Sequence, residues 1–215
     1  GTLGATPSTG GQNKYKINSG YATSLYLGQP VQYDTAGGAN TDPGYVISGQ
    51  DAITRPTVGV FNGCFYTDAN TNKPTFSSFF PRTTAPANAE DIDAFIIDNP
   101  FQQYNVQLST RLAATAILAQ AQMGKTLGLT VSALGAGSAT SGSTISGQSN
   151  SQLTVGGSTG VANQWRLLRS AEDPENEDLI TLPQLNPALA AFSGLATVVV
   201  VANQSQWFGT GQVSA

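Results

Sequence analysis

The stretch TVGVFNGCFYTDANTNKPTFSSFFP, residues 57–81, decides the fold because it has the pattern of a β-hairpin. Residues 58–66 are mostly apolar and β-favouring, with large side chains on both alternations, which predicts a strand covered at least in part on both faces. Turn-forming residues follow at 68–74, and an aromatic run at 75–80 continues until Pro81. We therefore expect two antiparallel strands joined by an exposed loop.

Alternation divides the large side chains of the first strand into two sets, one for each face. The sets are Val58, Val60, Cys64 and Tyr66 on one alternation, and Phe61 and Phe65 on the other. Cys64 is the only cysteine, so no disulfide can form within the chain. Inside such a strand we expect this thiol to be buried and inert.

The hairpin needs further strands, because a lone hairpin is only marginally stable in water. Turn signals separate other β-favouring segments at 15–27, 30–34, 45–48, 91–98, 104–110, 127–134, 165–168 and 196–202. The last segment has four consecutive valines, which predicts a strand buried on both faces, and we expect the hairpin to pack beside it. The expected fold class is all-β, a β-barrel or sandwich with long loops, a flexible N-terminal arm and at most one short helix.

The helix, or an irregular strand in its place, is expected at 111–123, with one helical turn near 187–192. The expected domain organisation has four parts: an extended N-terminal arm at 1–20, a single β-barrel domain at 21–215, and within that domain a Gly/Ser/Thr-rich loop at 135–160 and a long connection at 172–194. The arm is too poor in large apolar residues to order by itself, so we expect it to order on a partner.

Charge and composition exclude several functions. Charged residues make up only 10% of the chain, the net charge is −4, and the scattered lysines and arginines form no basic stripe, so nucleic acid is not an expected partner. No apolar leader or window of the ~20 residues needed for a membrane span is found, so no membrane partner is expected. The chain has no histidine, which removes the usual general base and zinc ligand, and we do not expect an enzyme.

Three local patterns suggest chemistry, but each has a simpler interpretation. Residues 68–72 begin like a calcium-binding loop, yet Lys73 stands where that loop needs glycine, and a hairpin turn explains the same residues. Residues 156–160 match GxSxG without a strand-to-helix elbow or a histidine partner. Acidic clusters at 90–93 and 172–178 have the carboxylates for a divalent ion or for hydrolysis, but solvated loops are the preferred interpretation. No metal or cofactor is expected.

Several spaced motifs follow one another in a specific order. They are GQPVQYD (28–34), TVGVFNGCFYTD (57–68) with its closing FSSFFP, DAFIIDNPFQQYNVQ (93–107), MGKTLGL, SGQSNSQLTV, QWRLLRSAEDPENED, and the valine strand followed by ANQSQW. Together they resemble a family of tailed-phage virion proteins that are encoded near the major capsid protein and act as capsid decoration, or cement, proteins. The resemblance begins near Gly28 and covers about 180 residues. Residues 1–20 carry none of it.

The resemblance implies a non-enzymatic β-barrel protein on the outer capsid surface of the virion. There it would bind a major capsid protein of the HK97-like fold and stabilise the lattice against internal DNA pressure. We also expect contacts to neighbouring copies of itself in a trimer, because closed symmetry is the default for proteins on a lattice axis. A weakly charged surface and long polar loops suit a protein that works through surface contact. Two alternatives stay open: a carbohydrate-binding or host-attachment β module, and a hydrolase that uses only Asp or Glu.

The arm and the polar loops are the expected contacts to the capsid or to neighbouring copies. A truncation lacking residues 1–16 is expected to fold but to bind capsids more weakly. Of the two tryptophans, Trp165 is expected in the core and Trp207 at an interface. The full set of interface candidates is Leu3, Thr6, Pro7, Gln12, Lys14, Tyr15, Lys16, Asn70, Asn72, Ile145, Gln148, Asn150, Trp207 and Phe208.

Overall fold

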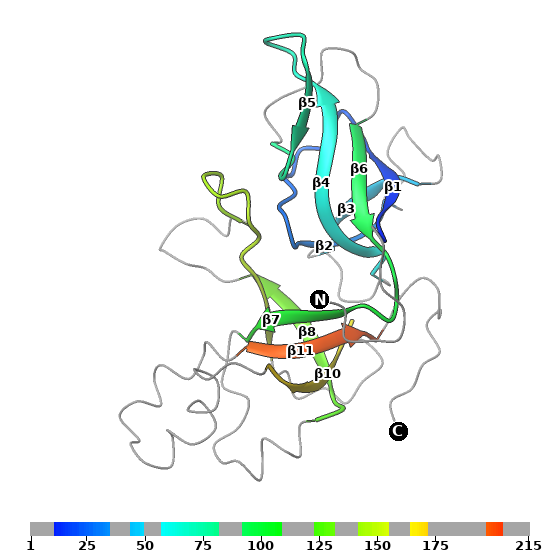
Figure 1. Ribbon diagram of the computed structural model, residues 1–215, viewed down its shortest axis with the longest axis vertical. Coiled ribbons are helices and arrows are strands. Elements are labelled where there is room, and N and C mark those ends of the chain that lie inside the picture. Colours follow the sequence, from blue (N-terminus) through cyan, green and yellow to red (C-terminus); the bar gives the residue numbers. More distant parts are fainter. Residues whose placement is uncertain are drawn as a thin grey trace.

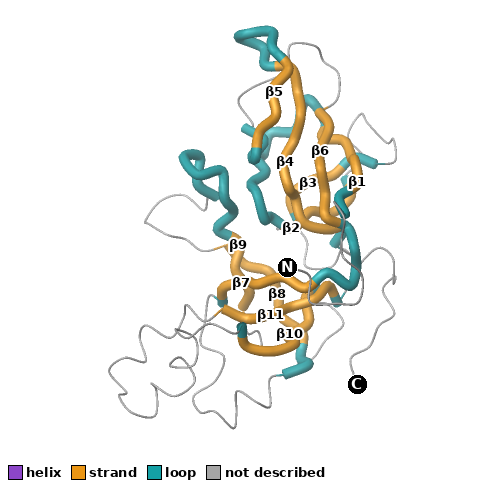
Figure 2. Tube along the Cα trace, viewed as in Figure 1, coloured by secondary structure: helices purple, strands orange, loops and turns teal. Residues whose placement is uncertain are grey.

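The computed structural model describes residues 11–34, 44–49, 57–81, 92–108, 123–131, 142–154, 164–171 and 197–203. These residues form an all-β fold of two antiparallel sheets, which confirms the expected class. Figure 2 shows only strands and loops in this part of the chain. The helix expected at 111–123 falls on residues outside the described ranges except for Met123, and the helical turn near 187–192 lies outside them altogether. Within these ranges no helix is long and apolar enough to span a membrane.

The first sheet has six strands and includes the hairpin (Figure 1). Its strands are β1 (Asn13–Ile17), β2 (Pro30–Tyr33), β3 (Val46–Ser48), β4 (Gly59–Thr67), β5 (Pro74–Ser77) and β6 (Ile92–Ile97). They run in the order β1-β6-β4-β2-β3, and β5 pairs with β4. The Lys16 N–H donates to the Gly44 carbonyl at 2.8 Å, which draws β1 towards β3. The sheet therefore curls around a buried cluster that includes Ile17, Phe61 and Phe80.

The hairpin is confirmed, with β4 and β5 antiparallel and joined by the turn at 68–73. The register between β4 and β6, however, shifts between Phe61 and Gly63, as in a β-bulge. Because of this shift Phe61 and Cys64 both face the buried core, with 0% exposure, although simple alternation places them on opposite faces. Phe65 is consequently turned outward and is 42% exposed.

The second sheet has five strands and is curled into a half-barrel (Figure 1). Its strands are β7 (Gln103–Gln107), β8 (Thr126–Val131), β9 (Ser151–Thr154), β10 (Trp165–Ser170) and β11 (Thr197–Ala202), in the order β7-β11-β10-β8-β9. A parallel bridge between Leu108 and Leu153 brings the two edges of the sheet together. Its own core contains Leu127, Trp165 and Leu167, so the expected burial of Trp165 is confirmed.

The valine strand β11 does not lie beside the hairpin, so that expectation is wrong. It pairs with β7 on one side and β10 on the other, in the second sheet. Val198, Val199 and Val200 are buried, as a central strand requires. The described strands form two hydrophobic clusters rather than one. Val60, at the start of β4, is the hairpin side chain that belongs to the cluster of the second sheet.

Two expected boundaries also need correction. Residues 13–17, assigned above to a flexible arm, form strand β1 and pair with β6 along their whole length. The polar loop expected at 135–160 contains strand β9, whose Leu153 is 1% exposed because it packs in the second core. Residues 1–10 and the connection at 172–194 lie outside the described ranges.

Candidate functional site

Exposed aromatic side chains gather on the outer face of the first sheet. Phe76 on β5 is 64% exposed, Phe65 beside it on β4 is 42% exposed, and Phe95 on β6 is half-buried. The rings of Phe76 and Phe95 lie 5.9 Å apart between centroids, and the missing side chain of Gly63 leaves room for the ring of Phe76. We call Phe65, Phe76 and Phe95 the aromatic patch. A single exposed apolar side chain is common on protein surfaces, whereas a cluster of them marks a surface suited to binding a partner.

A small charged group borders the aromatic patch on strands β1 and β6. Lys14 Nζ lies 2.8 Å and Lys16 Nζ 3.2 Å from the two carboxylate oxygens of Asp93. Partial burial acts to raise the pKa of Asp93, but the hydrogen bonds and charges of both lysines outweigh it and hold the pKa below its ordinary value. With two cations and one anion, this edge carries a net positive charge at neutral pH.

Tyr15 differs from its two lysine neighbours, because alternation along β1 turns it to the other face. Its hydroxyl donates to Asp98 Oδ2 at 2.8 Å, and Asn13 Nδ2 lies within 3.0 Å of both oxygens of the same carboxylate. Asp98 is 7% exposed, so these bonds stabilise a buried charge. Of these sequence-predicted contacts, Lys14 and Lys16 therefore lie on the surface, whereas Tyr15 secures β1 to the sheet.

The hairpin loop is a turn stabilised by its own first residue. Asp68 Oδ1 accepts hydrogen bonds from the backbone N–H of Asn70 at 2.9 Å and of Thr71 at 2.8 Å. The bond from the Thr71 N–H is the largest influence on Asp68 and lowers its pKa. Asn72 adopts a positive φ of 54°, which asparagine tolerates well. Asn70 and Asn72 are both exposed, which leaves their side chains accessible to a neighbour.

The described part of the polar loop, residues 142–150, presents one large apolar side chain. Ile145 is 98% exposed at a turn in which the Ser143 hydroxyl accepts hydrogen bonds from the N–H groups of Ile145 and Ser146. On the far side of this turn Gln148 forms a parallel bridge with Leu27, which lies between β1 and β2. The loop is therefore held at its base by the segment between β1 and β2, and it exposes an apolar tip.

Nucleophilic chemistry has little support in the described residues. Cys64 is 0% exposed, and burial raises its pKa to about 12, so the thiol stays protonated at neutral pH. Its burial confirms the sequence prediction. No group of three or more His, Cys, Asp or Glu side chains within the described ranges is arranged to hold a metal ion.

The interface candidates chosen from the sequence cover only part of this surface. One of them, Gln12, lies next to β1, and its Oε1 accepts a hydrogen bond from Asn62 Nδ2 at 2.6 Å. Five candidates fall outside the described residues: Leu3, Thr6, Pro7, Trp207 and Phe208. The aromatic patch was not selected, because its outward position depends on the register shift in β4. The high aromatic content of the hairpin was the one signal in the sequence that pointed to it.

No protein-family model, curated protein or solved structure was found to match this chain.

Proposed function

We propose that this chain is a structural virion protein, a capsid decoration protein that binds the outer surface of an HK97-fold capsid lattice and stabilises it. The sequence motifs that resemble the decoration family are one support. The observation that carries the proposal is the aromatic patch, which places Phe65 and Phe76 in solvent on a face formed by paired strands. A rigid apolar surface of this kind is suited to a permanent contact with another protein.

The energy available from the patch is appropriate to docking. Burying one phenylalanine side chain at an interface contributes about 1.5–3 kcal/mol, and aromatic residues are common among the few side chains that dominate binding energy. The lysines beside the patch, at 58% and 41% side-chain exposure, supply charge that orients a partner more than it adds affinity. Acidic groups on the partner, next to an apolar pocket, would complement this arrangement.

The proposed partners and location come from the sequence resemblance. The partners are the major capsid protein and neighbouring copies of this chain, and the location is the outside of the assembled capsid. Closed symmetry on a lattice axis makes a trimer the proposed assembly. No enzymatic step, nucleic acid or membrane takes part. Many contacts repeated over the lattice stabilise the capsid together, because a copy that is held by one contact is already close to its next binding site.

Quantitative gel densitometry of purified virus particles tests the proposal. A decoration protein occurs in roughly hundreds of copies per particle, because it follows the symmetry of the lattice. About a dozen copies or fewer would instead indicate a vertex, portal or tail component. Absence from the particle would reject a virion role altogether.

Treatment of particles with the purified protein adds a functional readout. Particles that have been stripped of this chain should lose their shell at a lower temperature than complete particles, and adding the protein back should restore the higher temperature. An unchanged shell transition after full rebinding would remove stabilisation from the proposal while leaving surface binding in place.

A further inference from the structure

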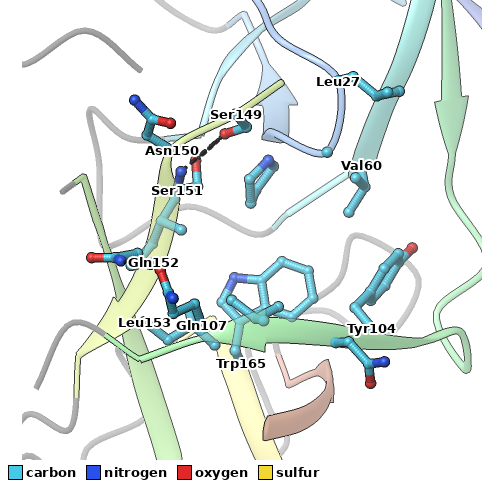
Figure 3. Close-up of a pocket in the computed structure, with 15 residues that line it drawn as sticks. Leu27, Val60, Tyr104, Gln107, Ser149, Asn150, Ser151, Gln152, Leu153 and Trp165 are labelled. Atoms are coloured by element: carbon cyan, nitrogen blue, oxygen red, sulfur yellow. Dashed lines mark hydrogen bonds between the residues drawn. The ribbon is translucent and has the colours of Figure 1, made fainter. Parts of the chain in front are cut away.

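A cavity of about 360 Å³ lies where the two sheets meet. Pro30 and Val60 line it from the first sheet and Leu27 from the segment that precedes β2, and strands β7 and β9 together with Trp165 line it from the second sheet (Figure 3). Hydrogen bonds join its two sides, because Leu27 donates to the Gly147 carbonyl and accepts from the Ser149 N–H, both at 2.9 Å. Its volume falls within the range of about 300–1,000 Å³ that is usual for small-molecule sites.

The two sides of the cavity differ in chemistry. In Figure 3 hydroxyl and amide side chains lie along one side, contributed by Gln107, Ser149, Asn150, Ser151 and Gln152. Leu27, Val60 and Tyr104 form the other side, and the indole of Trp165 lies between the two. Tyr104 and Trp165 meet edge to face, with ring centroids 5.6 Å apart at 89°. A ligand for this cavity therefore needs both an apolar face and a hydroxyl-bonding edge.

The lining of the cavity disfavours a charged ligand. None of the residues that line it is Lys, Arg, Asp or Glu. Tyr104 is its one titratable side chain, and burial together with the nearby charge of Asp98 raises the pKa of this phenol far above its ordinary value. A phosphate or carboxylate would lose its hydration here without gaining a counter-charge, which is strongly unfavourable. The suitable ligand is neutral.

The two glutamines on the polar side, Gln107 and Gln152, can form further hydrogen bonds. Gln152 Nε2 donates to Gln107 Oε1 at 2.6 Å. Two amides carry four N–H donors and two carbonyl oxygens, so this one bond leaves most of their capacity for another partner. Trp165 adds an Nε1–H that is buried and has no hydrogen-bond partner among the described residues. A buried donor without a partner is unfavourable, and an acceptor oxygen on a ligand would satisfy it.

We propose that this cavity binds a neutral saccharide unit. A pyranose ring has apolar C–H faces and a rim of hydroxyl groups that both donate and accept, and these two features match the two sides of the cavity. Amide and hydroxyl side chains with an adjacent aromatic ring are suited to such a ring because they bond hydroxyl groups without requiring charge. The site is separate from the aromatic patch, so saccharide binding and capsid docking are measured independently.

Tryptophan fluorescence tests the site directly. The chain has two tryptophans, so the Trp207→Phe variant leaves Trp165 as the only indole. Methyl glycosides of glucose, galactose and N-acetylglucosamine are titrated into this variant, with glucose 6-phosphate as a charged probe. We expect a saturable change in emission with at least one methyl glycoside and none with the phosphate. Absence of any saturable change with all three glycosides would overturn the proposal.

Two further substitutions locate the binding. Gln107→Ala removes an exposed amide on the polar side and should weaken binding roughly three- to tenfold, the equivalent of one hydrogen bond. Leu27→Phe fills the cavity from the apolar side and should abolish binding. Gln102→Ala is the matched control, since it removes an amide two residues before Tyr104 but outside the cavity. Wild-type affinity in both Gln107→Ala and Leu27→Phe would place the saccharide elsewhere and reject this site.

Discussion

The ring of Phe76 lies directly over the backbone of Gly63. A Cβ atom at position 63 would lie 3.0 Å from Cζ of Phe76 and 3.0 Å from the Ser77 carbonyl oxygen, closer than ordinary contacts allow. Gly63 also has φ of 133°, a conformation that other residues rarely adopt. This one glycine therefore permits both the register shift in β4 and the seating of the aromatic ring.

Gly63→Ala should destabilise the fold by about 2–4 kcal/mol, because backbone strain and steric crowding add. Chemical denaturation measures the change in the free energy of unfolding. Gly28→Ala is the matched control: Gly28 has φ of 85°, but nothing lies within 4 Å of its added Cβ. It should cost only the strain, about 1–2 kcal/mol. Equal losses in the two variants would show that crowding under Phe76 is unimportant.

Cys64 makes stability depend on pH in the alkaline range. Its pKa is raised from an ordinary value of 9.0 to about 12 in the folded chain. Between these values the unfolded chain loses the thiol proton and the folded chain keeps it, so the free energy of unfolding should fall as pH rises, by up to about 1.4 kcal/mol per pH unit. Below pH 9 this contribution is fully present.

Denaturation of wild type and Cys64→Ala at a series of pH values checks the effect. The variant should show a shallower loss of stability above about pH 9, with the residual slope coming from buried tyrosines such as Tyr66, whose pKa burial also raises. A thiol-reactive dye should modify wild type only after unfolding. Rapid modification of the folded protein would contradict the burial of this thiol.

Truncation at the N-terminus should separate the arm from the sheet. Removing residues 1–10 leaves β1 intact and should leave the free energy of unfolding nearly unchanged. Removing residues 1–17 deletes the partner of β6, the buried side chain of Ile17 and the bonds from Asn13 and Tyr15 to Asp98, at a cost of about 3–6 kcal/mol. Thermal unfolding of both variants measures this difference, and a fully stable chain without residues 1–17 would refute the role of β1.

The sequence alone predicted that a chain without residues 1–16 folds normally. Because β1 pairs with β6, we now expect that chain to be less stable than the complete one. Capsid binding by the chain that lacks only residues 1–10 is now the informative measurement for the arm. Weaker binding with an unchanged thermal transition would assign the arm a direct contact, whereas unchanged occupancy would remove it from the mechanism.

Phe76→Ser should reduce capsid occupancy at least about tenfold, since it removes the most exposed ring of the aromatic patch from the proposed interface. Phe101→Ser is the matched control, because Phe101 is 73% exposed but lies at the turn between β6 and β7. Sedimentation of stripped particles with each purified variant measures the bound fraction. The aromatic patch would be excluded as the docking surface if the two variants bound equally well.

Local features of the chain were predictable because they depend on neighbouring residues. The hairpin at 57–81 follows from a β-favouring run, a turn whose first residue is Asp68, and a second β-favouring run. Burial of Cys64 and Trp165 follows from their positions within apolar strands. The candidate surface was found only in part: Lys14, Lys16, Asn70 and Asn72 are accessible, whereas the aromatic patch was missed.

The sequence by itself determined that this protein is all-β, where most of its strands lie, and which turn closes its main hairpin, because alternation and turn chemistry act over a few residues. Only the tertiary structure decided that β11 belongs to the second sheet, that β1 closes onto β6, and that Phe61 turns inward while Phe65 turns outward. Strand order and register depend on pairings between residues far apart in the chain, and a shift of one residue reverses the face of every side chain that follows.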